Sequence, residues 1–324
     1  MRIERFVAAV VALGLGFVAS ASAETFPARP IKLVIPQSAG GHSDVVGRAL
    51  QTKLGQILEQ PVVIDNRGGA GGTIGAEAVA RSAPDGYTLL LGGSNNLAIA
   101  VALLTEVRYD PLRDFVPIGG VAVVRYAVAV RPGLPVNTLA ELLAYARERP
   151  ARLNYGSNGV GSTSNLALEW IQSAAGVNIV HVPYRVTAQA VLALLGGEVD
   201  VVVSDLATLL PHAKAGTLRI VAVAGGKRAA AAPGIPTVAE QGIPGFAIDA
   251  WYGIVAPAGT PPSVVARLAG ALRETLASPE VQQKFEESGF ETIVDTPAQF
   301  GAFIRADVER YSDVIRQTRL RAQP

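Results

Sequence analysis

The segment at residues 36–44 has the residue types of an anion-binding loop. It follows the apolar run 31–35 and precedes an amphipathic segment, which predicts a strand, a loop and a helix. Gly40 and Gly41 would let backbone N–H groups approach an anion, and the N-terminal dipole of the following helix favours negative charge. Such a loop lies at the carboxyl end of a parallel strand, where ligands of open α/β sheets bind. A simple turn is the alternative, because glycine and serine are frequent in turns.

A second segment of this kind lies at residues 156–165. It contains three glycines, four hydroxyl side chains and two amides in ten residues. This composition predicts a dense set of hydrogen-bond donors that suits a carboxylate. A flexible linker has a similar composition, but Tyr155 before the segment and Leu166 after it argue against one. We therefore expect two anion-binding loops that face each other across a cleft.

The glycine-rich segment 66–75 follows another expected strand but does not fit the G-x-G-x-x-G spacing of dinucleotide-binding loops. Close packing of a loop against a helix explains its glycines better.

Few residues suggest catalysis or metal binding. The three histidines are far apart in the sequence and lack the spacing of metal ligands, and there is no cysteine and no G-x-S-x-G motif. His181 ends an apolar run, where a hydrogen-bonded structural histidine is the usual finding. Asp205 follows the run 199–203 and is equally suited to cap the next helix or to bind a ligand. We expect no catalytic residues, no metal and no cofactor.

Short β-branched runs alternate with longer amphipathic segments along the chain, which predicts an α/β fold with parallel strands and right-handed crossovers. We expect two lobes, with helices 262–277 and 297–318 packing back on the first, so that the chain crosses between lobes at least twice. Crossing twice is what a hinged, ligand-enclosing protein needs. The expected ranges are 24–123 with 253–324 for lobe 1 and 124–252 for lobe 2. The helices are expected near 44–58, 138–148, 164–175 and 188–195, and the strands near 31–35, 61–64, 87–91, 126–130, 153–155, 178–182, 199–203, 218–223 and 251–256.

The N-terminal 23 residues have the pattern of a secretory signal peptide. Arg2 and Arg5 precede an apolar run from 6 to 19, and small residues at 21–23 form an A-x-A cleavage site. The chain has 28 Lys and Arg against 27 Asp and Glu, so 26 of each remain once Arg2, Glu4 and Arg5 are removed. A neutral chain without a basic stripe argues against nucleic-acid binding. We expect an exported, periplasmic protein.

The sequence resembles the substrate-binding receptors of tripartite tricarboxylate transporters, known as Bug receptors, over nearly all of the chain after residue 23. The blocks that carry the resemblance are PIKLV at 30–34, AGG at 39–41 with Asp44, PVVIDNR at 61–67, APDGYTL at 83–89, LNYGS at 153–157, HVPY at 181–184, LGGEVD at 195–200, PTVAE at 236–240 and APAGTP at 256–261.

The resemblance implies a type II periplasmic-binding-protein fold, with two α/β lobes joined by a hinge and a cleft between them. It implies that the chain closes around a small carboxylate (a di- or tricarboxylic, aromatic or amino acid) and delivers it to the membrane components of the transporter. A monomer is expected. The ligand-binding residues that the resemblance implies are Ser38, Ala39, Gly40, Gly41 and Asp44 on one side, and Ser157, Asn158, Ser162, Thr163, Tyr184 and Asp205 on the other. We add four candidates from positions where the sequence departs from the family pattern: His42, Ser94, Asn95 and Arg185.

The departures from the family pattern bear on the ligand. Leu97 stands where family members often have a histidine, and Arg185-Val186 replaces a Lys-Gly pair. Leu97 and Val186 would make the pocket smaller or drier, and Arg185 would either meet a second carboxylate or face solvent. Two other functions stay open: a sensor subunit for a membrane kinase, and an exported carboxylate-processing enzyme that uses Asp44, His181 or Asp205.

Overall fold

The structure is a computed structural model that describes residues 26–104, 106–184 and 186–318. The expected signal peptide and Arg185 lie outside the described residues. The elements are β1 (Ile31–Ile35), α2 (His42–Leu58), β2 (Val62–Asn66), η1 (Ala70–Gly72), α3 (Thr73–Ala80), β3 (Thr88–Gly93), η2 (Asn95–Ile99), α4 (Ala100–Leu103), β4 (Phe115–Val130), α5 (Leu139–Glu148), β5 (Asn154–Ser157), α6 (Thr163–Ala175), β6 (Val180–Pro183), α7 (Thr187–Gly196), β7 (Val201–Asp205), α8 (Leu206–Lys214), β8 (Arg219–Val223), η3 (Ala239–Gln241), β9 (Asp249–Pro257), α9 (Pro262–Ala277), α10 (Pro279–Glu287), β10 (Phe290–Thr292) and α11 (Pro297–Thr318).

The strands of the described residues form one continuous sheet in the order β2-β1-β3-β9-β4-β7-β5-β6, with β8 and β10 also paired to β4. β1 pairs in parallel with β2 and β3, and β5 pairs in parallel with β6 and β7, as the alternation of strands and helices predicts. The long strands β4 and β9 run antiparallel to each other between these two parallel groups.

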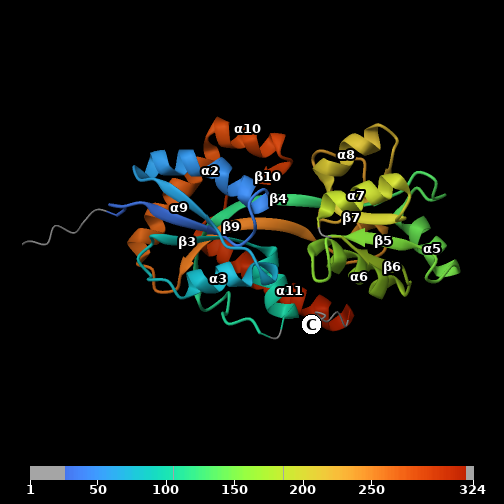
Figure 1. Cartoon of the computed structure of the whole chain (residues 1–324), viewed down its shortest axis with the longest axis horizontal. Helices are drawn as coiled ribbons and strands as arrows, with labels where there is room; N and C mark the ends of the chain where they lie inside the picture. The colour runs from blue at the N-terminus through green and yellow to red at the C-terminus, as the bar shows by residue number, and fades with distance from the viewer. Residues whose placement is uncertain (1–25, 105, 185, 319–324) are drawn as a thin grey trace, which may run out of the picture.

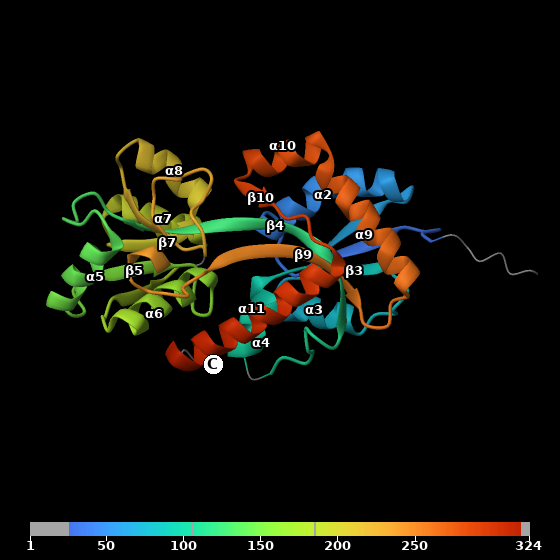
Figure 2. The same cartoon turned by 180° about the vertical axis from the view of Figure 1, so that it is seen from behind.

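Strand β4 joins the two lobes of the molecule. Its first part pairs with β9, up to Arg125 opposite Asp249, and its last part, from Tyr126 to Val130, pairs with β7 and β8. Figures 1 and 2 show β4 and β9 side by side between the two groups of helices. The expected lobe boundaries, 123/124 and 252/253, both fall inside these two strands.

The local sequence explains the helices that border the cleft. In α2, Val46, Leu50, Leu54 and Leu58 recur every four residues and are all buried, so one face of the helix packs on the sheet. In α6, the hydroxyl of Ser162 caps the first turn, and Gly176 ends the helix in the left-handed conformation.

The glycines of segment 66–75 serve close packing, as predicted. A Cβ at Gly72 would lie 2.9 Å from the carbonyl oxygen of Pro36, and one at Gly75 would lie 2.7 Å from that of Arg67. The segment therefore holds the β2–α3 turn against the loop after β1.

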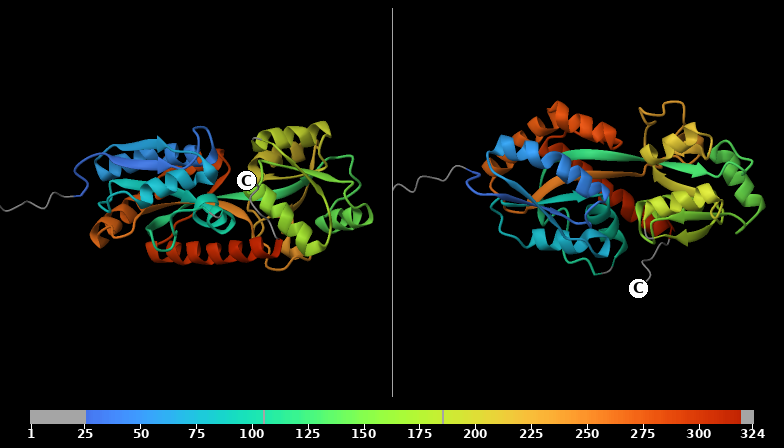
Figure 3. Two further views of the ribbon diagram at one scale, coloured as in Figure 1. Left: turned by 60° about the horizontal axis from the view of Figure 1, so that its bottom comes forward. Right: turned by 45° about the horizontal axis from the view of Figure 1, so that its top comes forward.

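The C-terminal part contains more elements than the sequence predicts. Helix α10 and strand β10, which the sequence does not predict, lie between the two expected helices. The sequence of α10 predicts a helix only weakly, because Val281 and Phe285 are the two residues that form its apolar face. Strand β10 has only three residues, which is too short for a clear pattern. α9 and α10 pack against α2, whereas α11 runs along β4 and also contacts α6 (Figure 3).

Buried side chains form one core that continues through β4 from the first lobe to the second, with a smaller cluster in each lobe. No helix among the described residues has both the length and the apolar character that a membrane span requires.

Candidate functional site

A cavity of about 370 Å³ lies between the two lobes. The first lobe contributes the loop after β1 and the end of β3, the second contributes the starts of α6, α7 and α8, and β4 and β9 form the floor. The lining residues are Gln37, Gly40, Gly41, His42, Ser43, Leu91, Gly93, Ser94, Asn95, Asn96, Tyr126, Asn158, Thr163, Val186, Thr187, Ala188, Asp205, Thr208, Ala250 and Tyr252.

The first wall is the N-terminus of α2. Gly41 is the N-cap residue and supplies no side-chain cap, and neither Ser43 nor Asp44 caps this helix. The hydroxyl of Ser43 instead donates to Oε1 of Gln37 over 2.6 Å. The first N–H groups of an α-helix have no acceptor within the helix. In α2 this leaves the amides of His42 and Ser43 available to an anion in the cavity.

Asp44 does not line the cavity but holds the shape of this loop. Its Oδ2 accepts from the amide of Gly40 and from Nε of Arg48, each over 2.9 Å, and its Oδ1 accepts from Nδ2 of Asn66 over 3.1 Å. The hydrogen bond from Arg48 is the main reason why the pKa of Asp44 falls from 3.8 to about 2. Asp44 is therefore ionised and structural.

The second wall satisfies most of its polar groups internally. The hydroxyl of Ser157 lies 2.6 Å from Nε2 of His181, whose ring stacks on Tyr155. Burial lowers the pKa of His181. Ser162 caps α6 by accepting from the amide of Asn165. His181 is thus the hydrogen-bonded structural histidine that its position predicts.

Asn165 ties the second loop to the core. Its Oδ1 accepts from the amide of Gly161 over 3.0 Å, and its Nδ2 donates to the hydroxyl of Tyr155 over 2.7 Å. The Tyr155 hydroxyl in turn donates to Oε1 of Glu169. The loop is therefore braced by a buried chain of polar side chains.

The lobes contact each other directly at one edge of the cavity. The hydroxyl of Thr163, in the second lobe, donates to Oδ1 of Asn95, in the first, over 3.1 Å. Nearby, a Cβ at Gly161 would lie 2.6 Å from Cδ2 of Leu103, so a side chain there would displace Leu103 of the other lobe. These contacts join the two lobes at this edge.

Asp205 has the first of the two roles that the sequence leaves open, the helix cap, and its position at the cavity is compatible with the second. It caps α8 by accepting from the amide of Thr208 over 2.8 Å, and it lines the cavity. The residue is 6% exposed, and its carboxylate accepts a further bond from the hydroxyl of Ser204. An acceptor at this wall can bind a donor group of a ligand.

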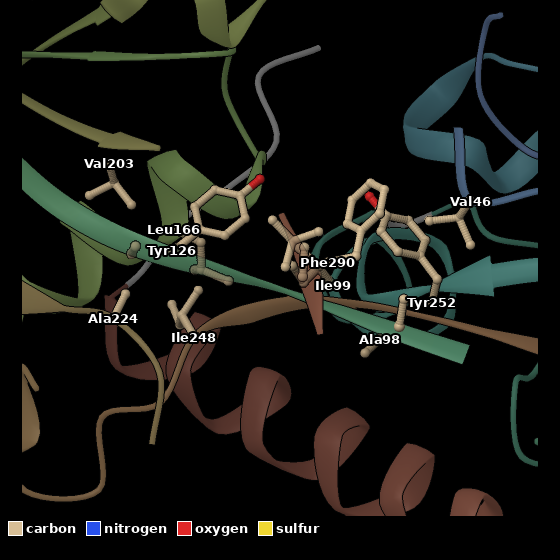
Figure 4. Packing of buried hydrophobic residues seen from close by; sticks show 14 of the residues in the cluster. Val46, Ala98, Ile99, Tyr126, Leu166, Val203, Ala224, Ile248, Tyr252 and Phe290 are labelled. Atoms are coloured by element: carbon tan, nitrogen blue, oxygen red, sulfur yellow. The ribbon is translucent and has the colours of Figure 1, made fainter. Parts of the chain in front are cut away.

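Two tyrosines of the hinge strands complete the site. Tyr126 in β4 and Tyr252 in β9 line the cavity, are 7% exposed each, and have hydroxyls without a hydrogen-bond partner among the described residues. Figure 4 shows both rings on the side of these strands that faces away from α11. Burial raises the pKa of both hydroxyls well above the ordinary value, so they are neutral donors at physiological pH.

Eight of the residues proposed from the sequence come together at this cavity: Gly40, Gly41, His42, Ser94, Asn95, Asn158, Thr163 and Asp205. Six others lie beside it without lining it: Ser38, Ala39, Asp44, Ser157, Ser162 and Tyr184. Arg185 lies outside the described residues. Val186 does line the cavity, but Leu97 is fully buried in the first-lobe core, so it does not shape the pocket as expected.

Sequence reasoning missed Gln37, Asn96, Tyr126, Thr187, Thr208 and Tyr252. For Thr187 and Thr208 a signal existed, since each lies at the start of a helix that follows a strand. Tyr126 and Tyr252 gave no such signal, because each is an aromatic residue in an apolar strand, which is typical of a core position.

The charge of the lining limits what the cavity can do. Among the lining residues that the structure describes, Asp205 is the one Asp or Glu, and there is no Lys or Arg. Among the described residues, no group of three or more His, Asp or Glu side chains is arranged to hold a metal ion. The cavity offers backbone N–H groups, amides and neutral hydroxyls, which bind a carboxylate without a buried cation.

Comparisons with known proteins agree with this architecture. Residues 46–320 match the family model of the tripartite tricarboxylate transporter family receptor. Protein BugT of Bordetella pertussis is 38% identical over 304 residues, which cover 94% of this chain and 93% of BugT.

Solved structures are similar over a comparable length. An R. palustris protein solved with adipate is 33% identical with a TM-score of 0.79, and the match covers 91% of this chain and 99% of that one. MatC from Rhodopseudomonas palustris, with bound malate, is 31% identical with a TM-score of 0.76, over 90% of this chain and all of MatC. The predicted binding-protein fold is confirmed. This chain belongs to the tripartite tricarboxylate transporter receptor family and is a member of its Bug group.

Proposed function

We propose that this chain binds a small carboxylate in the cavity between its lobes and delivers it to the membrane components of a tripartite transporter. The observation that carries the proposal is the uncapped N-terminus of α2 at the cavity wall, in a pocket whose described lining residues include neither Lys nor Arg. Such a helix end binds anions through its free N–H groups and its dipole.

The similar structures support the same ligand class. The R. palustris protein was solved with adipate and MatC with malate, and both ligands are carboxylates. The polar but largely uncharged lining of the present cavity suits an acid that is held by hydrogen bonds.

Binding and closure are coupled in this proposal. The two lobes would close about β4 and β9. Lobe 1 consists of residues 24–123 and 253–324, and lobe 2 consists of residues 124–252. The acid binds to the first lobe, and Asn158 and the α6 to α8 helix starts of the second lobe then enclose it. The direct bond from Thr163 to Asn95 would add to the closed state only, so ligand binding shifts the equilibrium between open and closed forms.

The proposal places the protein in the periplasm, as a monomer that releases its ligand unchanged. An enzyme acting on the same acid would need an acid–base or nucleophilic group at the cavity. Of the three candidates for that role, Asp44 and His181 are engaged away from the cavity by Arg48 and by Ser157. The third, Asp205, lines the cavity and serves as the N-cap of α8.

A thermal-shift screen of ligand-stripped protein against mono-, di- and tricarboxylates, aromatic acids and acidic amino acids tests the proposal. A ligand at about 100 times its dissociation constant stabilises the folded state by about 2.7 kcal/mol, which is readily measured. We expect at least one carboxylate to raise the melting temperature and to be recovered unchanged by mass spectrometry. A screen without any carboxylate that stabilises the protein would contradict binding, and chemical conversion of the acid would indicate an enzyme.

Delivery to a transporter has its own test. Reconstituted membrane components of the transporter should take up the bound acid only when the receptor is present. Uptake at the same rate without the receptor would leave the sensor function as the better explanation.

A further inference from the structure

A second cavity, of about 390 Å³, lies on the opposite face of the hinge strands from the first. Side chains alternate between the two faces of a strand. Tyr126 and Tyr252 line the first cavity, and their sequence neighbours Arg125 and Trp251 line the second, which we call the rear cavity. Figure 4 shows helix α11, which borders the rear cavity, on the side of these strands that faces away from the two tyrosine rings.

Both lobes contribute walls to the rear cavity. Gly226, Lys227 and Ala247 come from the lobe 2 segment between β8 and β9, and Phe303 and Arg310 come from α11 of lobe 1. A molecule in the rear cavity would therefore contact both lobes at once, and the width of the cavity depends on the angle between them.

Polar atoms without a partner gather at this cavity. Within the part of the chain that the structure describes, three side-chain polar atoms are shut off from solvent and have no hydrogen-bond partner: Oδ1 of Asp249, Nε of Arg310 and the hydroxyl of Tyr311. Asp249 and Arg310 line the rear cavity, and Cζ of Arg310 lies 5.1 Å from the centre of the Tyr311 ring. Buried polar groups are normally hydrogen-bonded. Three exceptions in one place indicate that a polar molecule, with small side-chain shifts, completes this side of the hinge.

The charges at the rear cavity favour an anion. Asp249, the one acid among the described lining residues, is neutralised by Arg125, which donates to it over 2.5 Å and to Glu291 over 2.7 Å. Lys227 is exposed and forms no ion pair with the described residues. Arg310 is ion-paired within its own helix, and its side chain is 32% exposed. Lys227 and Arg310 thus offer one cation from each lobe to an anionic group between them.

Two aromatic rings give the same cavity an apolar wall. Trp251 and Phe303 meet edge to face with their ring centres 5.3 Å apart, and Phe303 is 39% exposed although it is large and apolar. The indole is held in place because its Nε1 donates to Oδ2 of Asp307 over 2.6 Å. A flat ring in the cavity would cover Phe303 and contact Trp251.

We propose that the rear cavity is a second ligand site, which takes an aromatic anion with its ring against Phe303 and Trp251 and its charge between Lys227 and Arg310. The walls of this site and of the carboxylate cavity lie on opposite sides of β4 and β9. A rotation about these strands that holds the rear walls apart therefore brings the walls of the carboxylate cavity together. An occupant of the rear cavity favours closure and regulates the receptor.

The dye 8-anilinonaphthalene-1-sulfonate is a suitable probe, because it combines aromatic rings with one negative charge. The chain has two tryptophans, so Trp170→Phe leaves Trp251 as the single one. We expect one equivalent of the dye to bind to this variant and to quench the emission of Trp251. Absence of binding, or binding without quenching, would contradict the proposal.

Substitutions of lysine test the position of the charge. Lys227→Gln should weaken binding of the dye about fivefold, the effect of one exposed ion pair, whereas Lys227→Arg keeps the charge and should stay close to wild type. Lys214→Gln is the matched control, because it removes the same charge from an exposed position of lobe 2 outside the rear cavity. Equal losses in Lys227→Gln and Lys214→Gln would show that only the overall charge matters and would overturn the site.

Filling each cavity in turn locates the dye. Ala247→Phe places a ring in the rear cavity and should weaken binding at least about tenfold, because the space is then occupied. Ala188→Phe places the same ring in the carboxylate cavity and should have a much smaller effect. A loss in Ala188→Phe alone would put the dye in the carboxylate cavity and overturn the proposal. Circular dichroism and melting curves establish that each variant is folded.

Small-angle X-ray scattering tests the effect on closure. Saturating ligand-stripped wild type with the dye should lower the radius of gyration, and adding the dye to Ala247→Phe should not change it. An unchanged radius in saturated wild type would overturn the regulatory effect. None of these measurements uses a carboxylate ligand, so their failure leaves the proposed function intact, and failure of the carboxylate screen leaves the rear site intact.

Discussion

The two loops that face each other across the cavity look alike in sequence but use their polar groups differently. The first, at 36–44, is held by one ionised side chain, Asp44, which bonds to Gly40, Asn66 and Arg48 and leaves the start of α2 uncapped. The second, at 156–165, is held by several neutral groups that bond to each other, including the Ser162 cap.

The two loops therefore differ in how many hydrogen-bond donors they leave free for a ligand. In the first loop the side chain of Asp44 holds the backbone from the side away from the cavity. The backbone N–H groups that face the cavity therefore stay free for an anion. In the second loop most donors are used internally, and Asn158 and Thr163 reach the cavity. A segment rich in glycine and hydroxyl residues is therefore not in itself an anion site, because its own side chains can satisfy its donors.

The largest effect is expected from removing the side chain of Asp44, which holds the first loop. Asp44→Ala leaves the amide of Gly40 and the side chain of Asn66 without their acceptor in a buried place, at about 2–3 kcal/mol of stability. Because the same change frees the loop that presents the α2 start, carboxylate affinity should fall by about a hundredfold or more. Urea unfolding and calorimetry measure the two quantities.

Arg48→Ala is the matched control for this prediction. The Arg48 side chain is 55% exposed, so its ion pair contributes less than about 1 kcal/mol, and the bonds of Asp44 to Gly40 and Asn66 remain. An equal loss of affinity in both variants would mean that the charge of the pair, rather than the loop shape, supports binding.

A smaller effect is expected in the second loop. Asn165→Ala removes the acceptor of the Gly161 amide and should cost about 2 kcal/mol of stability and about tenfold in carboxylate affinity. Tyr155→Phe removes the outer bond of the same chain but keeps the contact to Gly161. We expect it to lower stability while leaving affinity closer to wild type, and equal losses of affinity would show that the loop is not held through Gly161.

Acid pH should affect the two loops differently, because only the first is held by an ionised side chain, the carboxylate of Asp44. The folded-state pKa of Asp44 is about 2, below its ordinary value of 3.8. Its contribution to stability is therefore complete above about pH 4 and is lost as the pH falls through 2. Unfolding free energies of wild type and Asp44→Asn, measured from pH 5 to pH 2, should converge at the acid end. A constant difference would contradict the lowered pKa.

The smallest effect is expected at the contact between the lobes. Thr163→Val keeps the shape of the side chain and removes the hydroxyl that donates to Asn95, which should weaken binding by about 0.5–1.5 kcal/mol. In a double-mutant cycle, Thr163→Val should add little to Asn95→Ala. Fully additive losses would show that the two residues act separately.

Much of the fold follows from local sequence. Strand β1 and helices α9 and α11 have the predicted bounds, and Thr138 and Ser162 cap helices where the pattern indicates a start. β4 is the clear exception: it begins at Phe115, whereas the sequence predicts a start at Tyr126. Pro117, Gly119 and Gly120 disfavour a strand locally, and pairing with β9 accommodates them through shifts in register.

The sequence by itself determined that two strand-to-helix loops would carry the polar groups and that few cations would accompany them. Hydrophobic periodicity, glycine positions and charge are local properties that can be counted along the chain. Only the tertiary structure decided which of those groups face the cavity. Asp44 turns away because Asn66, from a different strand, lies behind its loop. Tyr126 and Tyr252 become part of the site because β4 and β9 present both of them to the cavity.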